Sequence, residues 1–125
     1  MKAQKTQSTY DHHERMANMT FATVFPLYVH KIERKGRNKA ELLQVITWLT
    51  GYDERDLLKH IEAKSTFKVF FDQAHLHPNA YMIKGTICGY RIEEIDNPLT
   101  KKVRYLDKLV DELAKGKELK KILRL

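Results

Sequence analysis

The sequence predicts a mainly α fold, a compact array of about six short amphipathic helices. Three observations lead to this prediction. Apolar residues recur every three or four positions along most of the chain, side chains that favour helix N-caps precede several of these stretches, and glycines follow them. The 125 residues are 42% hydrophobic and 31% charged, which suits one core with a polar surface.

The first 18 residues show no apolar period, so we expect a flexible N-terminal segment at 1–18 and a single helical domain at 19–125. Ordered structure should begin at Thr20, with Pro26 in the first turn of a helix that Gly36 ends. The apolar positions of this helix are Phe25, Tyr28, Val29 and Ile32.

Three further helices are predicted in close succession. Asn38 with Glu41 is a near capping box for a helix that Gly51 ends, and Asp53 caps the next one. Either Ser65 or Thr66 caps a third. The apolar positions of these helices are Leu42, Val45, Ile46 and Leu49, then Leu57, Leu58 and Ile61, and then Phe67, Phe70, Phe71 and Ala74.

The segment from Tyr81 to Ile95 fits two structures. A helix is favoured by the spacing of Ile83, Ile87 and Tyr90, whereas alternation at Cys88, Tyr90 and Ile92 would suit a β-strand. Each of the two glycines in this segment lowers helix propensity by about 1 kcal/mol relative to Ala. We expect the helix and keep the strand as the alternative.

A longer helix is predicted after Asn97 and Pro98, ending near Gly116. Its apolar seam steps by four and three residues, and a short amphipathic piece follows it. Asp111 and Lys115 stand in the favourable order for a surface ion pair. The seam consists of Leu99, Val103, Leu106, Val110 and Leu113, and the last piece uses Leu119, Ile122 and Leu123.

Composition excludes several classes of protein. No stretch approaches the roughly 18 uninterrupted apolar residues of a membrane span, and the polar N-terminus has no signal-peptide core. Cys88 is the single cysteine, which excludes an intramolecular disulfide and a multi-thiolate metal site. We therefore expect a cytoplasmic protein without membrane contact.

The net charge of +7 is unevenly distributed. Residues 21–40 carry +4 and residues 98–125 carry +5, with a slightly acidic stretch between them. Two basic regions suit a polyanionic partner, but a Lys-rich helical surface also serves solubility. Both interpretations stay open at the level of sequence.

Four runs carry a resemblance to a known family: MTFATVFPLYVHKIERKGRNKAE at 19–41, WLTGY at 48–52, GTICGYRIEEIDNPL at 85–99 and RYLDKLVDELAKGK at 104–117. From about Met16 onward the chain resembles a bacterial family known as domain of unknown function number 2200. The family has no established activity, substrate or cofactor. The resemblance therefore implies a relationship and no mechanism.

The leading functional hypothesis is a non-enzymatic binding module for an acidic partner, either nucleic acid or an acidic protein. A basic helix-turn-helix elbow would converge on phosphate or carboxylate oxygens. Tyr52, after the turn at Gly51, is a further binding candidate because an exposed ring can stack on a ligand. The elbow consists of Lys31, Arg34, Lys35, Arg37 and Lys39.

Two alternatives belong to other classes. A small enzyme would use the titratable cluster of Arg91, Glu93 and Glu94, with Arg104 or Tyr105 beside it. A structural or self-association protein would pair the seam of the Pro98 helix with a second copy, although burial within its own domain is the default. Monomer and dimer both remain open.

Metal and thiol chemistry have weak signals. His75 and His77, near His60 and Asp72, would place imidazoles two residues apart, yet loop histidines without a spaced partner motif are usually solvated. Cys88 lacks an evident base and is expected to be a buried, inert thiol. We predict no metal site and no cofactor.

Overall fold

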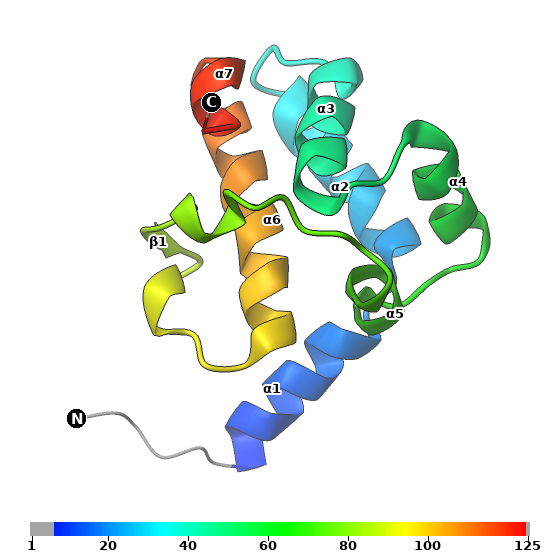
Figure 1. Ribbon diagram of the computed structural model, residues 1–125, viewed down its shortest axis with the longest axis vertical. Helices are drawn as coiled ribbons and strands as arrows, with labels where there is room; N and C mark the ends of the chain where they lie inside the picture. The colour runs from blue at the N-terminus through cyan, green and yellow to red at the C-terminus, as the bar shows by residue number, and fades with distance from the viewer. Residues whose placement is uncertain (1–6, 125) are drawn as a thin grey trace.

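The computed structural model describes residues 7–124 and confirms a mainly α fold (Figure 1). This part of the chain holds seven α-helices, one short antiparallel hairpin and two 3-10 turns, η1 and η2. The elements are α1 (Gln7–Asn18), α2 (Phe21–Glu33), α3 (Lys39–Thr50), α4 (Glu54–Glu62), α5 (Phe67–Asp72), η1 (Ala80–Met82), β1 (Thr86–Ile87), β2 (Tyr90–Arg91), η2 (Ile92–Glu94), α6 (Pro98–Ala114) and α7 (Leu119–Ile122).

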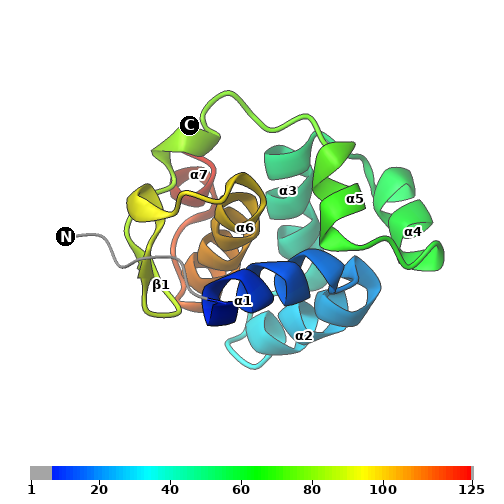
Figure 2. The ribbon, with the colours of Figure 1, turned by 90° about the horizontal axis from the view of Figure 1, so that it is seen from below.

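Helix α6 is the central element. Asn97 caps it by accepting a hydrogen bond from the Thr100 amide at 2.9 Å, and Pro98 occupies its first turn. It contacts α1, α2, α3, α5, α7 and β1, and Figure 2 shows it between the hairpin on one side and α3 and α5 on the other. The seam predicted for this helix is buried within the domain, at Val103, Leu106, Val110 and Leu113.

The predicted caps of the central helices are confirmed. Asn38 and Glu41 form a complete capping box on α3, and Asp53 caps α4. Thr66, one of the two candidates, caps α5. Gly51 ends α3 at φ 76°, where a Cβ atom would lie 2.9 Å from the His75 carbonyl oxygen, so both the conformation and the space require glycine.

Helix α2 begins earlier than the sequence predicts. Thr20 caps it through the Thr23 amide, so Pro26 lies inside the helix instead of in its first turn. The ring of Phe21 is fully buried and stacks on Phe70 with centroids 4.3 Å apart. This contact with α5 holds the first turn of α2 in place, so that turn forms without a proline.

The predicted exclusion of residues 1–18 from the domain is corrected by α1. Residues 7–18 form this helix, which packs against α5 and α6, and Met16 is buried in the core. His13 Nδ1 lies 2.7 Å from the Thr100 hydroxyl. Polar contacts and the buried Met16 hold α1 against the domain, and such contacts leave no apolar period in the sequence. Residues 1–6 lie outside the described part of the chain.

The helix favoured for Tyr81 to Ile95 is wrong, and the strand alternative is correct for a short hairpin. Thr86 pairs with Arg91, and Ile87 pairs with Tyr90. Cys88 and Gly89 at the turn both have positive φ, 52° and 80°. Two consecutive positive φ angles are the pattern of a type I′ hairpin turn, which a helix cannot accommodate. The expected burial of Cys88 is also wrong, because its side chain is exposed at this turn.

The core lies where α2, α3, α5 and α6 meet. Its aromatic part is a cluster of Phe21, Phe67, Phe70 and Phe71, with neighbouring ring centroids 4.3 to 6.4 Å apart. Each of these phenylalanines is at least 98% buried. Within residues 7–124, no helix combines the length and the apolar character that crossing a bilayer requires.

Candidate functional site

The two basic regions of the sequence meet at one end of the molecule. We call residues 31–41 and 111–124 the basic end; they form the α2–α3 turn and the α6–α7 turn with the adjoining helix ends. Figure 1 shows the α2–α3 turn and α7 at the same end of the molecule, and Arg37 of the first turn donates to the Lys117 carbonyl oxygen of the α6–α7 turn. These 25 residues carry ten cations and five acids, a net charge of +5 out of the +7 of the whole chain.

Both turns have the same backbone geometry. Gly36 and Gly116 have φ of 82° and 87°, and the amide of the following residue bonds five residues back, Arg37 to Ile32 at 3.0 Å and Lys117 to Glu112 at 3.1 Å. This is the Schellman helix ending, which glycine favours. Each basic run is therefore placed at a sharp corner.

Arg37 joins the two corners. Its Nη1 donates to the carbonyl oxygens of Leu113 and Lys117, at 3.2 and 2.9 Å, and its Nε and Nη2 donate to Glu41 Oε2 at 3.1 and 2.8 Å. The hydrogen bond from Arg37 is the main cause that lowers the pKa of Glu41. Because its donors are engaged within the protein, Arg37 supports the basic end instead of presenting a cation to a partner.

Several other cations of the basic end are also paired. Asp111 accepts from Lys31 at 3.5 Å and pairs with Lys115 at 3.0 Å; burial alone would raise the pKa of Asp111, but these two lysines outweigh it and lower that pKa. Glu112 is buried and takes a bidentate contact from Arg124 at 2.7 and 3.0 Å. The predicted pair of Asp111 and Lys115 is confirmed.

Four cations of the basic end are exposed and make neither an ion pair nor a ring contact within the described part of the chain. They are Arg34 and Lys35 at the α2–α3 turn and Lys120 and Lys121 on α7. Lys39, the remaining cation of the elbow, places its ammonium 5.7 Å from the centre of the Phe25 ring. These four cations can meet a partner without giving up a contact within the described part of the chain.

Tyr52 does not join the basic end. It follows the far end of α3, a helix of 12 residues, so about 18 Å of helix separates it from Lys39. Its hydroxyl donates to the Phe70 carbonyl oxygen, and burial, followed by the charge of Asp56, raises its pKa to about 12. The structure gives Tyr52 a packing contact with α5.

The alternative polar cluster is distributed among separate partners. Arg91 and Glu94 form an exposed ion pair at 4.0 Å. Glu93 Oε1 accepts a hydrogen bond from the Gly85 amide at 2.7 Å, which is the main cause that lowers the pKa of Glu93. These side chains brace the hairpin and its flank, and they do not converge on a common point.

Arg104 belongs to a partly buried network that the sequence does not reveal. Its Nη1 donates to Asp107 at 3.0 Å, its guanidinium lies 4.9 Å from the centre of the Tyr90 ring, and Tyr28 donates to the same carboxylate at 2.8 Å. Burial, followed by the charge of Asp107, raises the pKa of Tyr28 well above 10. Tyr28 and Asp107 are 79 positions apart, so no local pattern could have paired them.

Tyr105, the remaining member of the alternative cluster, is buried. Its ring lies among the apolar side chains of the core, and burial raises the pKa of its hydroxyl. It follows Arg104 directly on α6, so the two side chains project about 100° apart around the helix. Tyr105 therefore contributes to packing and does not extend the polar network.

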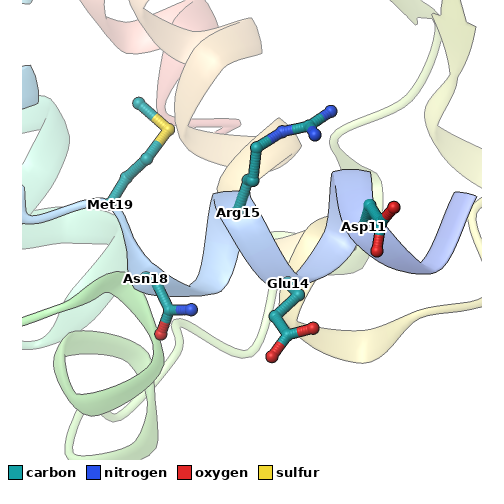
Figure 3. A pocket seen from close by; sticks show the side chains of 5 residues that line it. All are labelled: Asp11, Glu14, Arg15, Asn18 and Met19. Atoms are coloured by element: carbon teal, nitrogen blue, oxygen red, sulfur yellow. The ribbon is translucent and has the colours of Figure 1, made fainter. Parts of the chain in front are cut away.

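A surface hollow of about 550 Å3 lies along α1 (Figure 3). Arg15 and Met19 project from one side of the helix, and Glu14 and Asn18 from the other. Asp11 completes the lining. No residue of the basic elbow or of the alternative cluster contributes to this hollow.

Two of the three candidate histidines, His60 and His77, are engaged in packing, whereas His75 is exposed. His60 is buried, with Nδ1 2.7 Å from the Ser65 hydroxyl, and the ring of His77 stacks on Trp48 with centroids 4.4 Å apart. His77 Nδ1 also accepts the Asn79 amide at 3.0 Å. Within residues 7–124, no three His, Cys, Asp or Glu side chains are grouped so that they could hold a metal ion.

Comparison with known proteins identifies the family. The model of DUF2200, described as uncharacterized proteins conserved in bacteria, matches residues 15–124. The chain belongs to the DUF2200 family. The predicted relationship is thereby confirmed, and both segments of the basic end lie within the matched region. Most of α1, residues 7–14, precedes it.

A solved structure shares this fold. The crystal structure of uncharacterized protein SP1917 is 46% identical, with a TM-score of 0.83, over 89% of this chain and 92% of that one. No curated protein matches the chain. Membership of DUF2200 therefore brings a common architecture, and the function has to be argued from the surface of the molecule.

Proposed function

We propose that this DUF2200 protein is a non-enzymatic binding module that holds an acidic partner at its basic end. One observation supports the proposal above the others. Two basic segments about 80 residues apart in the chain share one end of the molecule, where Arg34, Lys35, Lys120 and Lys121 stand exposed without ion pairs in the described part. A concentration of positive charge at one end of the molecule creates a local electric field that attracts polyanions.

The distribution of charge favours binding over solubility alone. The 25 residues of the basic end carry +5, whereas the other 100 residues of the chain carry +2. Charges that serve only solubility are effective when both signs are interspersed over the surface. The internal bonds of Arg37 add rigidity, which reduces the entropy lost when a partner orders this surface.

The surroundings fit this role. The single thiol, Cys88, is free and exposed, which suits the reducing cytoplasm, where we place the protein. The cluster of Arg91, Glu93 and Glu94 is used for pairing within and around the hairpin, so the enzymatic alternative lacks a converged acid and base. We propose no cofactor.

The test is binding to generic duplex DNA, RNA and polyglutamate over a series of salt concentrations. If four cations contact the backbone of a DNA duplex, the logarithm of the association constant should fall against that of salt with a slope of about −3 to −4. Replacing Arg34, Lys35, Lys120 and Lys121 together by Gln should remove most of this slope. Arg37 is left out because its role is structural.

A matched variant separates site from total charge. Gln at Arg15, Lys59, Lys64 and Lys84 removes the same number of exposed cations elsewhere on the molecule. This control should keep most of the affinity and the salt slope. Binding that ignores salt, or that both quadruple variants weaken equally, would refute the proposal.

A further inference from the structure

An apolar groove lies next to the basic end, and its chemistry favours one class of acidic partner. It has a volume of about 340 Å3 and lies between α3 and α4, with Phe25 of α2 also in its lining. Its apolar lining is aliphatic apart from that ring: Leu43 from α3 and Leu57, Leu58 and Ile61 from α4. Leu58 is 54% exposed, so apolar surface faces water here without cover.

The groove and the basic end share a residue. Lys39 belongs to the elbow, lines the groove and holds its ammonium 5.7 Å from the centre of the Phe25 ring. Arg55 of α4 is a second cation in the lining, against one acid, Glu54. A partner bound to the exposed cations of the α2–α3 turn therefore meets apolar walls next to them.

This combination selects one class of partner. Phosphates satisfy the cations, but a nucleic acid presents mainly its charged backbone and offers little apolar surface to bury against leucine and isoleucine walls. The aromatic ring in the groove, Phe25, is only 7% exposed and lies under Lys39, so it provides no platform on which a base could stack. Carboxylates flanking apolar side chains satisfy both surfaces at once.

We infer that the acidic partner is a polypeptide segment, an acidic amphipathic helix whose leucine-like side chains enter this groove while its carboxylates meet Lys39, Arg55 and the exposed cations of the basic end. Helices that dock in this way present apolar anchors at positions i, i+3 or i+4, and i+7. The inference rests on the proposed function and names the partner that the same surface would hold.

The test uses three probes on the full chain at 150 mM salt, followed by fluorescence anisotropy. The first is an 18-residue helical peptide with leucines at that spacing and Glu or Asp on both flanks. The second is a scrambled peptide of the same composition, and the third is a DNA duplex of similar charge. The amphipathic peptide should bind about tenfold more tightly than either of the others, since only it buries apolar surface.

A pair of matched variants tests the location. Leu58→Ser removes an exposed leucine of the groove and should abolish most of the advantage of the amphipathic peptide. Leu27→Ser is the control, because Leu27 is 62% exposed on α2 but lies two residues after Phe25, about 200° around the helix. It should leave the advantage intact.

The outcomes separate this inference from the proposed function. Equal binding of the two peptides, tighter binding of the duplex, or equal losses in the two leucine variants would overturn the amphipathic helix while leaving salt-dependent binding at the basic end in place. If repeating the titrations over the salt series shows no salt-dependent binding of any probe, the proposed function itself fails.

Discussion

The basic end and the hairpin region, residues 84–94, are both dense in charge but use it differently. The hairpin region holds two cations and two acids, and its acids find partners in Arg91 and the Gly85 amide. The basic end holds twice as many cations as acids, so contacts within the described part leave four exposed cations without an ion pair or a ring contact. What distinguishes a surface whose charges pair with one another from one that can bind a partner is the ratio of positive to negative charges, more than the density of charge.

The two regions also differ in how their backbones are held. In the basic end, Arg37 of the α2–α3 turn donates to the Leu113 carbonyl oxygen near the end of α6 and to the Lys117 carbonyl oxygen of the α6–α7 turn. In the hairpin region, Lys108 donates to the Thr86 carbonyl oxygen at 3.0 Å and Glu93 accepts the Gly85 amide, both at exposed positions. Exposed contacts are worth less than partly buried ones, so the basic end should be the more sensitive to loss of a side chain.

The largest expected effect is at Arg37. Arg37→Gln removes hydrogen bonds to two carbonyl groups and to Glu41, and should lower the free energy of unfolding by about 2–3 kcal/mol. Arg91→Gln, in the hairpin region, should cost at most about 0.5 kcal/mol because its ion pair is exposed. Urea denaturation of the two variants measures both values, and equal losses would erase the contrast between the regions.

Acid titration should show the next largest effect. The pKa of Glu41 is lowered in the folded protein, so its contribution to stability is present above its unfolded pKa of about 4.3 and is lost as the pH falls through the lower folded value. Glu41→Gln should therefore be about 0.5–1 kcal/mol less stable than the parent at pH 7. The two should be equal near pH 2. A difference that persists in acid would show that packing, not charge, is responsible.

The smallest effect is expected at the hairpin turn and has the opposite sign. Cys88 adopts φ 52°, a conformation that asparagine tolerates better than other non-glycine residues. Cys88→Asn should raise the free energy of unfolding by about 0.5 kcal/mol and so raise the melting temperature slightly, whereas Cys88→Val should lower both. A stabilising valine would contradict the turn geometry.

Features with local signals could be predicted from the sequence. Asn38, Asp53 and Asn97 mark helix starts through their own side chains, and the seam of α6 repeats every three or four residues. Helix α1 could not be predicted, because among residues 11–18, whose side chains the structure describes, Met16 is the one buried apolar residue. The sequence does not predict the hairpin, because two strands of two residues each are too short to establish an alternating pattern.

The candidate site could be predicted from the sequence only in part. The basic residues of the elbow are plain in the sequence, but their roles differ through contacts with residues 111–124, about 80 positions away. Those contacts engage the Arg37 guanidinium within the protein. They also hold the α6–α7 turn, which precedes Lys120 and Lys121, next to the elbow. Long-range packing of this kind leaves no trace in local spacing.

The most direct test of the basic end is to map where an acidic ligand touches the folded protein. Backbone amide shifts in a 1H–15N NMR spectrum would be followed while polyglutamate is added at low salt. The largest changes should fall within residues 31–41 and 111–124, around Arg34, Lys35, Lys120 and Lys121. Changes centred on residues 84–94, or spread evenly over all exposed lysines, would contradict the account.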